Sequence, residues 1–80
     1  MKAYQSEVQV ETRDAQPTRL IWQGQAYPVQ AVLDRWRYGG RWWLGERPRT
    51  CYLVQAGVLT VELHQEDGEE GRWWLARLQD

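Results

Sequence analysis

The sequence predicts an all-β domain, a small antiparallel meander of about six strands curled as a partly open SH3-like barrel or as a strongly twisted sheet. Apolar and polar residues alternate with a period of two along most of the chain, as in half-buried strands. Short glycine-containing segments separate the alternating runs, which favours hairpins. The 80 residues fit a single domain, and a sheet this small must curl to bury one face.

The first strands are expected on either side of two turns. Residues 4–12 alternate apolar and polar side chains, which indicates a strand with one wet face, although residues 1–6 are expected to fray. Residues 14–17 have turn chemistry that ends in a proline. Leu20 and Trp22 then share a strand face, and residues 23–25, Gln-Gly-Gln, predict a tight turn.

Residues 26–38 predict one long strand whose apolar stripe changes face part-way. Val29 and Leu33 share one parity, whereas Trp36 and Tyr38 occupy the other. Because a strand keeps one parity per face, we expect a bulge or sharp bend near residues 31–34. Such a bend lets one strand serve two sheets. One helical turn is the alternative, although its apolar positions would not form a single face.

The second half predicts a hairpin followed by three further strands. Gly39 and Gly40 suit a two-residue turn, with residues 41–44 returning as a strand and residues 45–49 forming a loop. The inward residues expected in the later strands are Thr50, Tyr52, Val54, Leu59, Val61 and Leu63. Turns are expected at residues 55–57 and 66–71, and residues 72–78 form the last strand, with both faces covered.

The charge pattern limits the classes of partner. The net charge of −1 supplies no global field that would draw the chain to nucleic acid or an anionic membrane. Locally, residues 34–49 carry five arginines, and residues 62–70 carry five acidic residues and no basic one. The start of the chain has no signal-peptide pattern, and no segment approaches the ~20 apolar residues that span a bilayer. We therefore expect a soluble cytoplasmic protein without a membrane partner.

No residue pattern predicts catalysis, a metal site or a cofactor. His64 is the only histidine and Cys51 the only cysteine, and strand spacing alone does not put them on one face. We expect an exposed histidine and a small packed cysteine, and hence no enzyme. Asp34 and Glu46 could form an acid–base pair, but Asp34 more simply caps the bulge or pairs with an arginine. The acidic residues 66–70 lack the ligand spacing of a calcium loop.

An arginine- and tryptophan-rich stretch is the candidate binding surface. Its residues are Arg35, Trp36, Arg37, Arg41, Trp42, Trp43 and Arg49. They favour a non-enzymatic binding module for single-stranded nucleic acid, where rings stack on bases and arginines contact phosphates, or for a protein partner. The alternatives are aromatic rings that cap the barrel ends under stacked arginines, and a structural domain that self-associates as a homodimer.

Four segments carry a resemblance to a known family. They are Trp22-x-Gly24-x-x-Tyr27-x-Val29, Val32-Leu33-Asp34-Arg35-Trp36, Gly40-Arg41-Trp42-Trp43-x-Gly45-Glu46 and Arg72-Trp73-Trp74-Leu75-Ala76-Arg77, followed by a closing Asp80. From about Val8 to Asp80 the chain resembles a small bacterial domain family of unknown function. Similar segments form the C-terminal tail of Y-family-polymerase-like mutagenesis proteins, so the resemblance implies a link to DNA repair. It supplies no catalytic residues, and Cys51 and Leu53 stand where it implies an aromatic and a polar residue.

Overall fold

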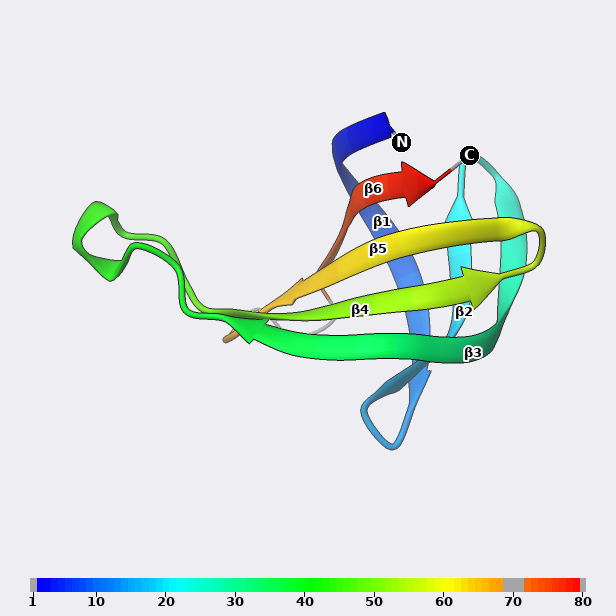
Figure 1. Ribbon diagram of the computed structural model, residues 1–80, viewed down its shortest axis with the longest axis horizontal. Helices are drawn as coiled ribbons and strands as arrows, with labels where there is room; N and C mark the ends of the chain where they lie inside the picture. The colour runs from blue at the N-terminus through cyan, green and yellow to red at the C-terminus, as the bar shows by residue number, and fades with distance from the viewer. Residues whose placement is uncertain (1, 69–71, 80) are drawn as a thin grey trace.

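The computed structural model describes residues 2–68 and 72–79, with side chains for residues 6–41, 43–68 and 72–79. These residues form an all-antiparallel barrel whose strands pair in chain order, and β1 pairs with β6 to close it (Figure 1). The strands are β1 (Lys2–Arg13), β2 (Gln16–Trp22), β3 (Gln25–Tyr38), β4 (Arg49–Ala56), β5 (Leu59–Glu66) and β6 (Trp73–Gln79). The predicted small β-barrel is confirmed, and it is closed.

Two long strands each serve two neighbours. Residues 2–8 of β1 pair with β6, and residues 9–13 pair with β2. Residues 25–28 of β3 pair with β2, and residues 29–38 pair with β4. The β3–β4 register shifts between Val29 and Ala31 and again between Val32 and Asp34. The predicted bulge is therefore confirmed, and the alternative of a helical turn is wrong.

Tight turns join three of the strand pairs, and two of them differ from the prediction. Asp14 and Ala15, with φ of 52° and 65°, form the β1–β2 turn, so Pro17 belongs to β2 and not to the turn. Residues 57–58 form the β4–β5 turn, which leaves Ala56 as the buried last residue of β4. The expected turn at residues 23–25 is confirmed, with positive φ at residues 23 and 24.

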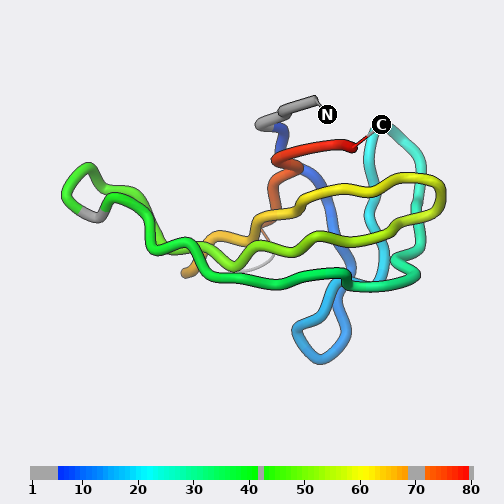
Figure 2. The backbone as a smooth tube through the Cα atoms, viewed as in Figure 1, coloured from blue at the N-terminus to red at the C-terminus, as the bar shows by residue number. Residues whose placement is uncertain are grey.

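The connection from β3 to β4 corrects the prediction of a Gly39-Gly40 hairpin turn. Residues 39–48 form a loop with a short 3₁₀ helix, η1 (Trp42–Leu44), and residues 41–44 do not form a strand. Gly40 has φ of 73°, and a Cβ on it would lie 2.9 Å from the carbonyl oxygen of Arg47. The Leu44 N–H donates to the Arg41 carbonyl at 2.8 Å, which closes the loop on itself. We call residues 39–48 the projecting loop, because the loop extends away from the barrel at the left of Figures 1 and 2, while the Pro48 carbonyl at its base accepts the Asp67 N–H at 2.9 Å.

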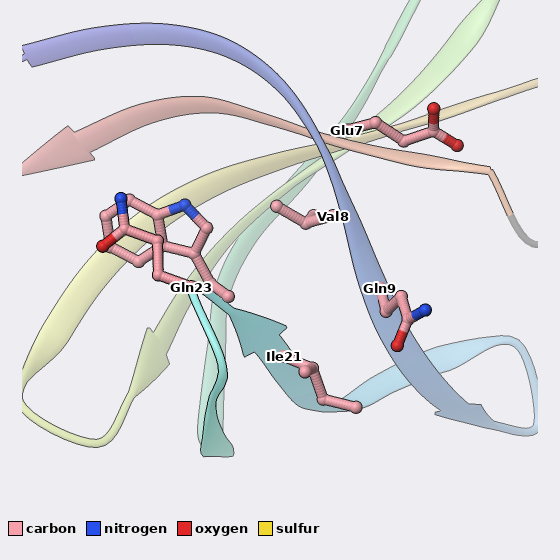
Figure 3. Close-up of a pocket in the computed structure, with 6 residues that line it drawn as sticks. Glu7, Val8, Gln9, Ile21 and Gln23 are labelled. Atoms are coloured by element: carbon pink, nitrogen blue, oxygen red, sulfur yellow. The ribbon is translucent and has the colours of Figure 1, made fainter.

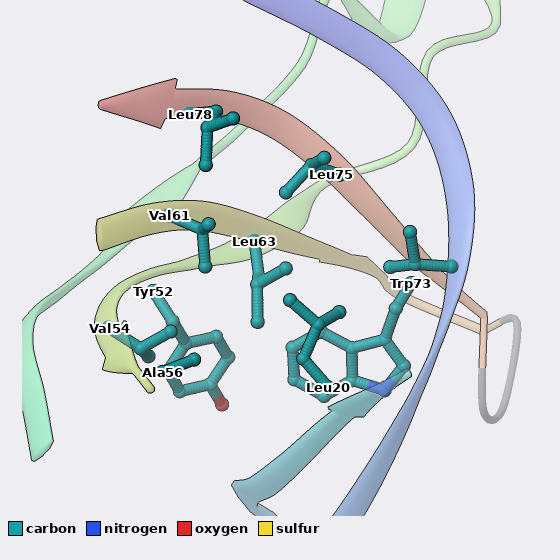
Figure 4. Packing of buried hydrophobic residues seen from close by; sticks show 10 residues of the cluster. Leu20, Tyr52, Val54, Ala56, Val61, Leu63, Trp73, Leu75 and Leu78 are labelled. Atoms are coloured by element: carbon teal, nitrogen blue, oxygen red, sulfur yellow. The ribbon is translucent and has the colours of Figure 1, made fainter. Parts of the chain in front are cut away.

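The core lies between β2 and the wall formed by β4, β5 and β6. Tyr52 and Trp73 are buried against each other, with ring centroids 5.3 Å apart (Figure 4). A register shift in β6 skips Ala76, which turns both Leu75 and Leu78 inward and explains the two-sided sequence pattern. The buried hydrophobic cluster consists of Val8, Leu20, Tyr52, Val54, Ala56, Val61, Leu63, Trp73, Leu75 and Leu78. No helix in the described ranges is long and apolar enough to cross a membrane.

Candidate functional site

A row of four side chains crosses the outer face of the β3–β6 wall. Trp36 pairs with Cys51, Cys51 pairs with His64, and His64 pairs with Trp74. Directly opposed residues in an antiparallel sheet share a face, so this row lies opposite the core face of the same strands. Three of the four residues, Trp36, Cys51 and His64, line a cavity of about 540 Å³, which we call the outer cavity. The outer cavity is lined by Trp36, Tyr38, Arg41, Glu46, Arg49, Cys51, Glu62, His64 and Arg77.

His64 is enclosed in this cavity, which corrects the expectation of an exposed strand histidine. Only 14% of its side chain is exposed. Its Nε2 lies 2.6 Å from Glu62 Oε2, and its Nδ1 lies 3.2 Å from Nη1 of Arg49. Because a guanidinium can only donate, Nδ1 is the acceptor and Nε2–H donates to the Glu62 carboxylate. The contacts therefore hold one neutral tautomer of the imidazole.

Cys51 and His64 share this face but do not form a nucleophile–base pair. Cys51 is buried, and burial together with the Glu62 carboxylate raises the pKa of its thiol. A reactive cysteine needs a thiolate and an adjacent base. Both ring nitrogens of His64 already have partners in Glu62 and Arg49. The arrangement is typical of a packed polar cluster rather than of acyl-transfer chemistry.

Arg49 connects the cavity to the end of the β3–β4 hairpin. Its guanidinium lies over the Tyr38 ring, 5.5 Å from the centroid, while it donates toward His64. Its Nε is buried and has no hydrogen-bond partner among the described residues. Nearby, Arg41 Nε donates to Glu46 Oε2 at 2.7 Å within the projecting loop. The cavity rim is thus a mixture of aromatic rings and partly neutralised charges.

The predicted surface is divided between two faces of the sheet. Arg35 lies over the Tyr52 ring at 5.8 Å, on the opposite side of β3 from Trp36. Arg37 is on that side too, and donates to Thr50 Oγ1 at 2.7 Å and to both Asp67 carboxylate oxygens. The hydrogen bond from Arg37 lowers the pKa of Asp67.

The other predicted residues lie at the cavity or on the projecting loop. Trp36, Arg41 and Arg49 line the outer cavity. Trp43 is 63% exposed on the projecting loop. The side chain of Trp42 lies outside the described residues.

The two carboxylates considered for acid–base work have separate structural partners. Asp34 Oδ1 accepts the backbone N–H of Arg35 at 2.8 Å, beside the second register shift of β3. Glu46 is paired with Arg41. Asp34 therefore caps the bulged segment, as expected from the sequence. The described residues contain no group of three or more histidine, cysteine or acidic side chains that could hold a metal ion.

A second hollow, of about 520 Å³, lies where β1 leaves β2 to join β6. Figure 3 shows its lining by Glu7, Val8 and Gln9 of β1, by Ile21 of β2, and by Gln23 just beyond β2, with Trp22 completing it. Its one acidic side chain, Glu7, lies 3.6 Å from Arg72 Nε. Because this hollow gathers fewer charged and aromatic groups, the outer cavity is the better candidate site.

Comparison with known proteins identifies the family of this chain. Over residues 1–80 the chain matches the family model described as Domain of unknown function (DUF6504). The chain belongs to this family. The expected membership of a domain family of unknown function is thereby confirmed. Comparison with curated proteins finds no match, and comparison with solved structures finds none either.

The sequence analysis missed most of the cavity floor, although a signal for it exists. Counting outward from a turn at residues 57–58 pairs Ala56 with Leu59 and, five residues further on, Cys51 with His64. The expected turn at residues 55–57 would instead pair Cys51 with Val61, so it hid the pairing with His64. The sequence contains no such signal for the position of Arg77 in the cavity, because that position depends on the β5–β6 register shift.

Proposed function

We propose that this DUF6504 domain is a non-enzymatic protein-recognition module. Its contact surface comprises the outer cavity and the projecting loop. The observation that carries the proposal is a run of exposed apolar side chains from the cavity to the loop: Trp36 and Tyr38, then Trp43 and Leu44, the last two each 63% exposed. Exposed aromatic clusters on a small domain are typical of partner surfaces.

Charge pairing favours a protein over a nucleic-acid strand as the partner. Single-strand binding depends on a basic groove that follows the phosphates. Here Arg37 is paired with Asp67 and Arg41 with Glu46, so two of the predicted phosphate contacts are already neutralised. Glu46 and Glu62 also line the cavity. These carboxylates would repel a phosphate backbone.

The class of partner follows from the family resemblance. Segments similar to this chain form the tail of polymerase-like mutagenesis proteins, which suggests a DNA-repair protein as the partner. The absence of a thiolate–base pair at Cys51 and His64 supports binding rather than catalysis.

The test is partner capture from host-cell lysate with matched surface variants. Trp43→Ser combined with Leu44→Ser removes the exposed apolar residues of the projecting loop. Val58→Ser, at an apolar residue that is 92% exposed on the β4–β5 turn, is the control. We expect one specific protein to be captured by the wild type and by Val58→Ser, and lost from the loop variant. Equal capture by all three would contradict the proposal.

Two further measurements separate the other classes of partner. Anisotropy of labelled single-stranded DNA should show no saturable binding at low salt. Salt-sensitive binding that is lost in Arg41→Ala would instead indicate a nucleic-acid surface. Sedimentation at low and high salt should show a monomer, and a dimer that the Trp43→Ser, Leu44→Ser variant abolishes would indicate self-association.

A further inference from the structure

β3 has an open edge along most of its length. Only residues 25–28 pair with β2, and residues 29–38 pair with β4 alone among the described strands. Residues 30–38 are all exposed. In Figure 1 this part of β3 forms the lower border of the sheet and extends toward the projecting loop. An exposed edge of this kind presents unpaired N–H and C=O groups that can accept a further strand.

The β4–β5 hairpin fixes which backbone groups of β4 point toward β3. Ala56 and Leu59 flank the two-residue turn, and the residues that close such a hairpin form a hydrogen-bonded pair. Hydrogen-bonded pairs recur at every second residue of an antiparallel ladder. Tyr52 therefore directs its backbone groups to β5, and Cys51 directs its own to β3.

The same alternation fixes the groups that β3 presents at the edge. Trp36, opposite Cys51, bonds to β4, so Arg35 and Arg37 direct their N–H and C=O groups outward. The contact of the Arg35 N–H with Asp34 Oδ1 agrees with this direction, because a side chain reaches that N–H where no strand does. Arg37 is the next outward donor, and it lies within the regular register of five pairs that runs from Asp34 to Tyr38.

The side chains beside this edge indicate what would pair with it. Trp36 and Tyr38 lie on the face of the outer cavity, while Arg35 and Arg37 lie on the other face. Arg35 stacks on Tyr52 and has no carboxylate partner among the described residues. An acidic side chain opposite Arg35, alternating with apolar side chains opposite the rings, would complement both faces, while Arg37 is already paired with Asp67.

A second copy of this chain is a poor occupant of the edge. In a two-fold β3–β3 pairing, residues on the same face oppose each other. Centring the pair on residue 35, 36 or 37 then sets Arg35 or Arg37 opposite an arginine of the second copy in every case. Like charges directly opposed across strands are destabilising.

We propose that the outer edge of β3, over residues 34–38, binds an extended segment of the partner protein as an added strand, with acidic and apolar side chains in alternation. This inference rests on the proposed protein-recognition function and specifies the chemistry of the partner. The added strand receives the outward N–H of Arg37, and its apolar side chains pack beside Trp36 and Tyr38 at the rim of the outer cavity.

Amide hydrogen exchange measured by NMR on the full chain tests strand addition. The probe is a synthetic peptide of alternating valine and glutamate, with an alternating valine–lysine peptide as the control. At a peptide concentration four times its Kd, exchange at the Arg37 N–H should slow about fivefold. The Trp36 N–H should change little, because it already bonds to β4. The valine–lysine peptide should slow neither.

Several outcomes would overturn the inference. The first is that the valine–glutamate peptide does not bind. The second is that it binds without slowing exchange at the Arg37 N–H, and the third is that the two peptides have equal effects. Slower exchange that depends on protein concentration alone would assign the edge to a second copy.

A pair of variants separates the backbone contact from the side-chain contact. Arg37→Ala removes the guanidinium and keeps the N–H, whereas Arg37→Pro removes both, and proline is tolerated at an outward edge position. Peptide binding should survive in Arg37→Ala, because that guanidinium is already paired with Asp67, and be lost in Arg37→Pro. Equal binding by the two would overturn strand addition. The proposed protein-recognition function would still hold in that case if the Trp43→Ser, Leu44→Ser variant fails to capture the partner.

Discussion

The closed barrel and the projecting loop use the same residue type in opposite ways. Trp73 is fully buried and stacks on Tyr52, whereas Trp43 is largely exposed on a 3₁₀ turn outside the barrel. A single core supplies little stability in a domain of this size. A tryptophan that stays exposed therefore contributes little buried apolar area to that core. The difference places the core of the domain in the barrel, and it supports the proposal that the β3–β4 hairpin is the recognition surface.

Within the β3–β6 wall the same division separates the two faces of one strand. Tyr52 points into the core, and its neighbour Cys51 points into the outer cavity beside His64. The inner face is apolar and continuous, while the outer face holds charged groups in a hydrogen-bonded cluster. The predictions below test this division from the largest expected effect to the smallest.

Trp73→Ala should have the largest effect on stability. Removing a buried tryptophan leaves a cavity and costs about 3–5 kcal/mol of unfolding free energy. Denaturant unfolding monitored by circular dichroism would measure it. A loss below about 1 kcal/mol would show that the ring is not part of the core that holds the barrel together.

Gly40→Ala should destabilise the projecting loop measurably. Alanine at φ of 73° is strained by about 1–2 kcal/mol, and its Cβ would meet the Arg47 carbonyl at 2.9 Å. Gly39→Ala is the matched control, because a Cβ there meets nothing within 4 Å. Unfolding free energies of the two variants would be compared. Equal values would contradict the close approach of Gly40 to Arg47.

The Arg37–Asp67 ion pair should make a small, pH-dependent contribution to the free energy of unfolding, and Asp67→Asn should remove it. The pKa of Asp67 is lowered in the folded protein, so its contribution is complete above the ordinary carboxyl pKa of about 3.9. It is lost as the pH falls through the lower, folded-state pKa. The melting temperatures of wild type and Asp67→Asn should differ slightly at neutral pH and converge below that range. A difference that grows in acid would contradict this sign.

Trp43→Ser combined with Leu44→Ser should have the smallest effect on stability. Both side chains are mostly exposed, so their loss should change the unfolding free energy by no more than about 0.5 kcal/mol. The same denaturant titration would measure it. A loss comparable to that of Trp73→Ala would show that the loop is part of the folding unit and would remove the contrast with the barrel.

Local alternation is why much of the fold could be predicted from the sequence. The inward residues of β4 and β5, such as Val54 and Val61, keep one parity over a whole strand. The bulge of β3 was predictable because Leu33 and Trp36 break that parity. The same rule, applied strictly, also separates adjacent residues, so Arg35 and Trp36 had to lie on opposite faces.

Features set by contacts between distant residues were not predictable. A Gly-Gly pair fits a hairpin turn as well as a loop, and the choice depends on the approach of Gly40 to the Arg47 backbone. The enclosure of His64 depends on Arg49 reaching it from the neighbouring strand and on Glu62 beside it. The contact with Arg49 requires the β4–β5 register, which the misplaced turn concealed, whereas Glu62 lies two residues before His64 on the same strand.

The central claim is that recognition requires the projecting loop, whereas the barrel folds without it. Tyr38 and Arg49 are directly paired, so residues 39–48 can be replaced by Asn-Gly, which forms a two-residue hairpin turn. The decisive measurement is capture of the partner protein by this shortened chain after circular dichroism has established that it is folded. The account predicts a folded barrel that no longer captures the partner. Undiminished capture by the folded, shortened chain would contradict it.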